Sequence, residues 1–262
     1  MTEDRSVESA RPESLGERFS SASDLFKEHD SRLAVIVGSG TSLATMRFED
    51  LMRPWIYTFA INHEPWRNSD KYIPNSWIFF DKGVAIDHGS PSKCRWCGGN
   101  DEISDSTTVF SRKKVIDEII AEGRSPRWMK NLRIYENEYP WEPHRGKVYM
   151  NKTTATAALS LAIEMGFKTV AMLGVDLYAP ENGYYYHGVN PKNKITPRPS
   201  QKKFGEKRID AQHQQMLGDF SYMNTRMKKL AKEVKVYQCS MGSPLDCFEK
   251  APWQEVVRRY GR

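Results

Sequence analysis

The chain has 262 residues, of which 39% are hydrophobic and 27% charged, and its formal net charge is +6. This composition is typical of a globular protein with a sizeable core and excludes a largely disordered chain. No apolar run approaches the roughly 20 residues that a membrane-spanning helix needs. Residues 1–18 are polar and charged, unlike a signal peptide, so we expect a cytoplasmic location and no membrane span.

The first 25 residues are rich in Ser, Glu and Arg without periodicity, and we expect a disordered arm there. The following segment, 26–262, alternates between strand-like and helix-like patterns. Short β-branched and aromatic runs predict strands at Arg32–Val37, Ile56–Asn62, Ser76–Asp81, Thr107–Arg112, Leu132–Glu136, Lys168–Leu173 and Lys235–Cys239. Helices are expected at Leu43–Met52, Lys113–Glu122, Thr153–Met165, Glu206–Glu233 and Trp253–Arg259.

This alternation predicts a single Rossmann-like α/β domain, with an open, mainly parallel sheet flanked by helices. Two segments interrupt the pattern, and both are expected to be irregular insertions. Residues 83–106 are rich in Gly, Ser, Asp and Cys, and residues 179–205 in Tyr, Gly and Pro. Long loops in compact domains are commonly functional, so the second insertion is predicted to be a lid.

Two distant segments share one pattern, an apolar strand that ends in glycine and then polar residues. They are Leu33–Leu43, which contains Gly38-Ser-Gly-Thr-Ser, and Val170–Tyr178, which contains Gly174-Val-Asp. Apolar runs of this kind suit strands buried on both faces of a parallel sheet. Ligands of such sheets bind at the carboxyl ends of the strands. We therefore expect Ser39, Thr41, Ser42 and Asp176 to face one crevice.

The turn from Gly38 to Ser42 is a candidate phosphate-binding loop. Backbone amides can approach a phosphate closely at Gly38 and Gly40, and the Thr41 and Ser42 hydroxyls can donate to it. The pattern is not a full dinucleotide fingerprint, because Leu43 stands at the third glycine position and no Walker lysine follows. A tight strand-to-helix turn without a ligand is the plainer alternative, but the position of the turn after the first strand favours the phosphate-binding interpretation.

Polar residues also end two other predicted strands. Asn62-His63 follows one and Asp81 the next, and both positions favour the same crevice, although Asn and Asp are also common turn residues. Asp176 is a candidate to bind ribose, a divalent cation or a base, and His187 follows in a Tyr-rich loop. An imidazole near a carboxylate suits general-base catalysis near neutral pH.

The basic residues and the cysteines leave alternatives open. Basic residues gather in Lys192–Lys207 and on the predicted helix that carries Arg226, Lys228, Lys229 and Lys232. A solvated surface is favoured over nucleic-acid binding, because a modest charge excess specifies no partner. Cys94-Arg-Trp-Cys97 has zinc-knuckle spacing, and Cys239 and Cys247 could complete a four-cysteine site. Free, reduced cysteines are the favoured expectation.

Several of these residues resemble those of one superfamily with two branches. Gly38-Ser-Gly-Thr-Ser-Leu43 is similar to the Gly-x-Gly-Pro-Ser-Leu turn of bacterial CMP-sialic-acid-dependent sialyltransferases, and Asn62 matches the Asn after their second strand. The segment Asn151–Tyr178 resembles their helix-strand unit, which ends in Gly-x-Asp-x-Tyr. The motility accessory factor and 6-hydroxymethylpterin pyrophosphokinase MptE-like branch shares the turn and has a loop histidine, which His187 resembles. The likeness covers roughly residues 33–62 and 150–240.

The sequence departs from the sialyltransferase pattern at two places. Thr41 replaces the proline of the turn, and Phe204 or a neighbour stands where the family places a catalytic histidine before the helix that begins near Glu206. His187 or His213 would have to take the role of that histidine. The resemblance therefore carries the fold and the nucleotide crevice to this chain more firmly than the reaction.

The resemblance implies a glycosyltransferase-like enzyme that transfers a sugar from a nucleotide-activated donor, such as a CMP-sugar, to a hydroxyl acceptor. Asp176 and His187 are the expected catalytic residues. The expected nucleotide-binding residues are Gly38, Ser39, Gly40, Thr41, Ser42, Asn62, Asp81, Thr153 and Thr154. No protein-bound metal is expected in this case.

Two other functions remain open. One is magnesium-dependent pyrophosphoryl transfer to a hydroxymethylpterin-type alcohol. The other is a non-catalytic nucleotide- or nucleic-acid-binding protein, for example of phage type. The acceptor and the oligomeric state are not predicted.

Overall fold

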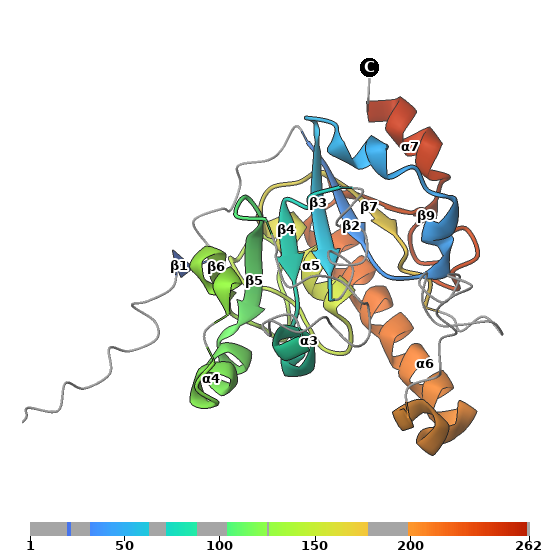
Figure 1. The fold of residues 1–262 in the computed structure, drawn as a ribbon. Coiled ribbons are helices and arrows are strands. Elements are labelled where there is room, and N and C mark those ends of the chain that lie inside the picture. Colours follow the sequence, from blue (N-terminus) through green and yellow to red (C-terminus); the bar gives the residue numbers. More distant parts are fainter. Residues whose placement is uncertain are drawn as a thin grey trace, which may run out of the picture.

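The computed structural model of the chain describes residues 20–21, 32–62, 72–87, 104–124, 126–177 and 199–260. Nine parallel strands form one sheet in the order β1-β6-β5-β4-β3-β2-β7-β8-β9 (Figure 1). The strands are β1 (Ser20–Ser21), β2 (Leu33–Val37), β3 (Ile56–Ile61), β4 (Ser76–Ile78), β5 (Thr108–Arg112), β6 (Leu132–Tyr135), β7 (Thr169–Leu173), β8 (Lys235–Gln238) and β9 (Glu249–Lys250). The prediction of an open, parallel Rossmann-like α/β sheet is confirmed.

The order of the strands reverses at the centre of the sheet, between β2 and β7. From β2 the chain proceeds through β3, β4, β5 and β6 to one side, and then returns to the other edge of β2 as β7. Leu33 therefore pairs with Ile56 on one side and with Thr169 on the other. Every residue of β2, β3 and β7 is buried, because helices cover both faces.

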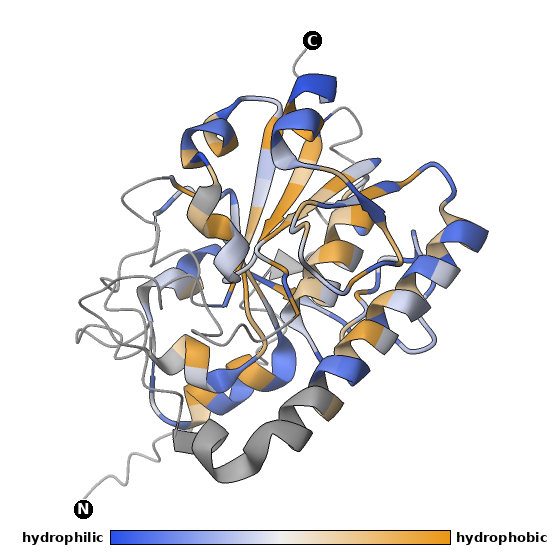
Figure 2. Ribbon diagram, turned by 90° about the vertical axis from the view of Figure 1, so that its right-hand side faces the viewer, coloured by the Kyte–Doolittle hydropathy of each residue, from blue (hydrophilic) through white to orange (hydrophobic). Residues whose placement is uncertain are grey.

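One face of the sheet is covered by α5 (Thr154–Glu164) and α6 (Pro199–Leu230). All eleven residues of α5 are buried, because it packs against β2, β3 and β4 on one side and against α6 on the other. This position requires small and apolar side chains around the whole helix, in agreement with the Ala- and Leu-rich sequence. Figure 2 shows that the strands and the helix surfaces next to the sheet are mostly hydrophobic, while the helix surfaces that point away from the sheet are hydrophilic.

The opposite face carries shorter elements in two groups. The 3₁₀ helices η2 (Thr41–Thr45) and η3 (Phe48–Met52) pack with α7 (Trp253–Tyr260) over β2 and β7. Helices α3 (Lys82–Asp87), α4 (Lys113–Ala121) and the 3₁₀ helix η4 (Arg127–Asn131) form a second core over β4, β5 and β6. The sheet is therefore the middle layer of three.

Several boundaries differ from the predictions. The expected helix at Leu43–Met52 is two 3₁₀ helices, η2 and η3, because Met46 adopts an extended conformation between them. Part of the expected irregular segment 83–106 belongs to α3, whose first turn is capped by Asp81 instead of continuing the strand.

The second expected insertion, 179–205, is also partly helical. Helix α6 begins at Pro199, a residue whose fixed φ suits the first helical turn. In the expected disordered arm, Ser20–Ser21 pairs with Arg133 and Ile134 as the edge strand β1. The edge strands β1 and β9 are not among the predicted strands. Each has two residues, which is too few to show the alternation of apolar and polar side chains that identifies a strand.

None of the described helices combines the length and the apolar character that crossing a bilayer requires.

Candidate functional site at the strand-order reversal

The two glycine-containing segments meet at the carboxyl ends of β2 and β7. The Gly38 amide donates to the Leu173 carbonyl over 2.7 Å, and the Gly40 amide donates to the Gly174 carbonyl over 2.8 Å. The parallel ladder of β2 and β7 thus continues into the two loops. The expected meeting of these segments is confirmed, and it lies where the order of strands reverses, the usual ligand position in open parallel sheets.

The close approach of the two loops explains both glycines of the turn. A Cβ atom at Gly38 would lie 2.3 Å from the Gly174 carbonyl oxygen. One at Gly40 would lie 2.3–2.7 Å from the carboxyl atoms of Asp176. Gly174 adopts φ +63°, a left-handed conformation that favours glycine. The Gly-x-Gly pattern is therefore required by packing between the loops, whether or not a ligand binds.

Asp176 is the centre of this loop pair and is only 5% exposed. Its Oδ2 accepts hydrogen bonds from the Ser42 amide at 2.9 Å and from Thr41 Oγ1 at 3.3 Å. Its Oδ1 accepts from Ser42 Oγ at 2.5 Å. The two hydroxyls expected to donate to a phosphate thus donate, together with the Ser42 amide, to a carboxylate of the protein itself, which places a negative charge in the turn.

A third strand end joins this network through Ser240, which follows β8. Ser240 Oγ lies 2.9 Å from Ser42 Oγ, and the Ser240 amide donates to Gln238 Oε1 over 2.9 Å. Gln238 Nε2 in turn donates to the Val175 carbonyl over 3.0 Å. The sequence offered one signal for Ser240, its position directly after a predicted strand. The network holds the loops after β2, β7 and β8 in one arrangement.

On the other side of β2, Asn62 connects the end of β3 to the start of α5. Asn62 adopts φ +54°, a left-handed conformation that Asn tolerates. Its Oδ1 accepts from Thr154 Oγ1 at 2.9 Å, and its carbonyl accepts from Trp77 Nε1 at 2.7 Å. Thr153 Oγ1 accepts from the Ala155 amide at 3.2 Å and caps the helix. The positive end of the α5 dipole therefore lies beside Asn62 at the carboxyl edge.

The remaining candidates stand apart from these contacts. Ser39 is half-buried and makes no hydrogen bond to the described part of the chain. Asp81 is exposed, and its Oδ1 accepts from the Gly83 amide at 2.7 Å, which caps α3. His187 and His63 lie outside the described residues, as do the basic residues of segment 192–198. His213 is half-buried on α6.

The described cysteines lie on different faces of the sheet. Cys239 packs with the core that includes α7, and Cys247 with the core that includes α6. Both are free, and burial raises their thiol pKa values, to about 12 for Cys239 and about 11 for Cys247. Cys94 and Cys97 lie outside the described residues. Within the described ranges, no group of three or more His, Cys, Asp and Glu side chains could hold a metal ion.

Asp219 on α6 was not predicted, and it fixes the segment that leads into α5. Its Oδ1 accepts from Tyr149 Oη at 3.1 Å and from Asn151 Nδ2 at 2.9 Å, and its Oδ2 accepts from the Lys152 amide at 2.9 Å. Burial raises the pKa of the Tyr149 phenol, and the Asp219 charge raises it further. Asp219 therefore holds the chain immediately before the Thr153 cap.

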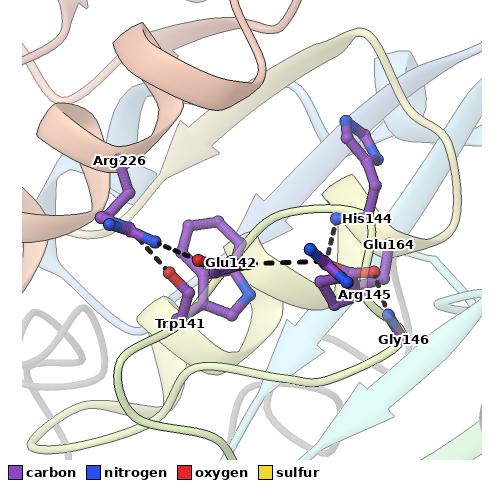
Figure 3. Close-up of polar contacts among 7 residues, drawn as sticks. All are labelled: Trp141, Glu142, His144, Arg145, Gly146, Glu164 and Arg226. Carbon is purple, nitrogen blue, oxygen red and sulfur yellow. Dashed lines mark hydrogen bonds and ion pairs between the residues drawn. The ribbon is translucent and has the colours of Figure 1, made fainter.

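A second unpredicted carboxylate, Glu164, anchors the loop that precedes this segment (Figure 3). Its Oε1 accepts from the His144 amide and its Oε2 from the Gly146 amide, both at 2.8 Å. Arg226 Nε donates to the Trp141 carbonyl at 2.9 Å. Burial raises the pKa of Glu164, opposed by the two amide donors. Its only signal in the sequence is a single carboxylate inside an apolar helix.

Searches among known proteins return structural matches alone: no family model and no curated protein sequence matches the chain. The solved structures that match include the sialyltransferase CstII from Campylobacter jejuni in complex with CMP-3FNeuAc, at 11% identity and a TM-score of 0.47, over 84% of this chain and 86% of that chain. Another is the monofunctional alpha-2,3-sialyltransferase Cst-I from Campylobacter jejuni, at 12% identity and a TM-score of 0.46, over 86% of this chain and 81% of that chain.

Proposed function

We propose that the chain is a glycosyltransferase-like enzyme that takes its sugar from a nucleotide-activated donor, with a CMP-sugar as the first candidate. One observation carries the proposal: the loops after β2 and β7 are locked together by Asp176 at the point where the strand order reverses. Open parallel sheets bind nucleotides at this point. The residue pattern of the same loops resembles the CMP-sugar enzymes.

The nucleoside is placed across the ends of β2 and β3. Ser39 is half-buried and has no hydrogen bond to the described residues, so its hydroxyl and amide are suited to a ligand. The Asn62 side chain, oriented by Thr154, supplies an amide group beside it. The amides of Gly38 and Gly40 already donate to the carbonyls of Leu173 and Gly174, so these glycines shape the pocket wall.

The donor phosphate is assigned to the start of α5 rather than to the Gly38–Ser42 turn. Asp176 already accepts the turn's Ser42 amide, and its negative charge would repel a second anion there. The start of α5 has the opposite polarity, because a helix dipole is positive at its amino end. Thr153 and Thr154 lie at this end, and the basic residues of segment 192–207 are candidates to neutralise the leaving phosphate.

Asp176 is proposed as a positioning residue, and His187 as the base that deprotonates the acceptor hydroxyl. The Asp176 carboxylate already accepts three hydrogen bonds from the Thr41–Ser42 turn, so we assign it the orienting role and assign proton transfer to His187. No observation on the described residues favours the pyrophosphokinase or the nucleic-acid-binding alternative.

A thermal-shift screen tests the proposal. The full chain is heated with CMP, UDP, GDP, ATP or a CMP-sugar at millimolar concentration, with and without magnesium. We expect CMP and CMP-sugars to raise the Tm without magnesium, since a ligand that binds only the folded state stabilises it. A shift by ATP alone that requires magnesium would favour the pyrophosphokinase, and no shift by any ligand would contradict the nucleotide site.

A matched pair of threonine variants locates the ligand. Thr154→Val removes the hydrogen bond to Asn62 at the carboxyl edge, whereas Thr169→Val removes the hydrogen bond from Thr169 Oγ1 to Tyr260 Oη at the start of β7. Both threonines are buried. We expect Thr154→Val to weaken CMP binding about tenfold and Thr169→Val to leave it unchanged. Equal affinities would contradict the placement.

A further inference from the structure

A cavity of about 300 Å³ lies far from the carboxyl edge, between the last turns of α6 and the beginning of β8. Lys235, the first residue of β8, lines it, whereas Ser240 of the candidate site follows the other end of that strand. We name it the α6–β8 cavity, and its principal lining residues are Met227, Lys228, Lys232, Lys235, Cys247 and Phe248.

The inner wall of the α6–β8 cavity is apolar. Met227, Val236 and Phe248 line it and are buried members of the core on the α6 face of the sheet. The Cys247 thiol is half-buried beside them, and burial raises its pKa to about 11, so the thiol is neutral near pH 7. This wall can pack against a ring or a short aliphatic group, but offers it few polar partners.

The rim of the cavity is positively charged. Lys228, Lys232 and Lys235 are exposed and form no ion pair with any residue of the described ranges. Nearby Lys250, by contrast, pairs with Asp246 at 2.5 Å. The one acidic lining residue, Glu249, pairs with Arg259 at 3.2 Å. The ammonium group of Lys228 lowers the pKa of Cys247 against the larger effect of burial, as expected for a cation close to the wall.

We propose that the α6–β8 cavity binds a small amphipathic anion, with its apolar body on the Met227–Phe248 wall and a single anionic head group between the three lysines. Cations with no acidic partner in the described part of the chain, placed around an apolar hollow, complement such a ligand in both charge and polarity. The volume of about 300 Å³ is at the lower limit of small-molecule pockets, which restricts the body to about three aromatic rings. This site is independent of the proposed transferase function.

The proposal is tested with 8-anilinonaphthalene-1-sulfonate and with N-phenyl-1-naphthylamine, which has the same rings without the sulfonate. Fluorescence titration of the folded full chain gives both dissociation constants. We expect the sulfonate to bind at least about fivefold more tightly, and high salt to reduce the difference. Equal affinities would show an apolar site only and overturn the anionic specificity.

Charge reversals assign the binding to the cavity. Lys232→Glu and Lys235→Glu change its rim, whereas Lys229→Glu makes the same change at an exposed residue of α6 that does not line it. We expect the first two variants to raise the dissociation constant of the sulfonate about fivefold or more, and the third to leave it within about twofold. Equal effects of all three, or displacement of the sulfonate by CMP, would overturn the assignment.

Cysteine protection gives a readout that does not depend on fluorescence. Alkylation by iodoacetamide, followed at each peptide by mass spectrometry, is expected to slow at Cys247 when the sulfonate is bound. Cys239, in the core on the other face of the sheet, serves as the internal control and should not change. An unchanged rate at Cys247 under saturating sulfonate would contradict the site.

Discussion

Asp176 and Ser42 are joined twice, since one carboxylate oxygen accepts the Ser42 amide at 2.9 Å and the other accepts the Ser42 hydroxyl at 2.5 Å. These residues are 134 positions apart in the sequence. The carboxylate after β7 therefore stabilises the loop after β2, and the geometry of the candidate site depends on this pair.

Replacement of Asp176 separates its structural role from a chemical one. Asp176→Ala leaves the Ser42 amide and hydroxyl without this acceptor, and we expect a loss of about 3 kcal/mol in the free energy of unfolding. Asp176→Asn keeps one acceptor oxygen and should lose about half as much. Urea unfolding measures both. If the alanine variant were as stable as the wild type, the carboxylate would not hold the turn.

Two glycine substitutions compare a crowded position with an open one. Gly40→Ala places a methyl group against the Asp176 carboxyl, where no side chain fits without movement, and should cost about 1–3 kcal/mol. Gly218→Ala, in α6, meets no atom within 4 Å and should gain up to about 1 kcal/mol, because alanine favours the helix. Thermal unfolding gives both changes. A neutral Gly40→Ala would show that the loops can separate at no cost.

Asp219 offers a test of the segment before α5. Asp219→Ala removes the acceptor of three hydrogen bonds and is expected to cost about 3 kcal/mol, whereas Tyr149→Phe removes one of them and should cost about 1 kcal/mol. The exposed Asp246, whose ion pair with the described residues is to Lys250, is the control: Asp246→Ala should change stability by less than about 1 kcal/mol. Equal losses for the two aspartates would refute the anchoring role of Asp219.

Glu164 should make stability depend on pH. Burial raises its pKa in the folded protein above the value of 4.5 in the unfolded chain, so the folded state binds the proton more tightly. The resulting stabilisation is complete below the unfolded pKa and is lost as the pH rises through the folded pKa. Glu164→Gln cannot titrate. We expect the free energy of unfolding of the wild type, minus that of the variant, to fall as the pH rises above the unfolded-state pKa of 4.5.

Urea titrations of both proteins at several pH values measure this difference. A difference that does not change with pH would mean that the carboxyl has the same pKa in both states. A difference that increases with pH would mean that the two amide donors outweigh the effect of burial.

The central strands were predictable because their residues are apolar on both faces. Leu33–Val37 and Thr169–Leu173 lie within one residue of the predicted bounds, and the Thr153 cap and Gly166 mark the ends of α5 in the sequence. The meeting of the Gly38 and Asp176 segments followed from the rule that parallel strands present their carboxyl ends at one edge.

The partners of the polar residues could not be predicted. The sequence predicted that Ser42 and Asp176 lie in one crevice, but whether they face a ligand or each other depends on how closely the two loops approach, which the residue pattern does not encode. Asp219 and Glu164 had weaker signals, because an isolated carboxylate in a helix is ordinarily exposed. Their roles depend on the course of the 141–152 segment, which has no regular secondary structure over most of its length.

The reversal of strand order at β2 also bears on how the chain reaches its native state. One edge of β2 pairs with β3, the next strand in the sequence, while the other edge pairs with β7, which follows only after β4, β5 and β6. Contacts between residues so distant in sequence slow folding, because the chain loses the entropy of closing the intervening loop before the strand pairing compensates for that loss. Until then the apolar β2 presents an unpaired edge, a template for association with a second chain. We therefore expect refolding yields to fall as the protein concentration rises. We also expect the pairing of β2 with β7 to form last in the sheet.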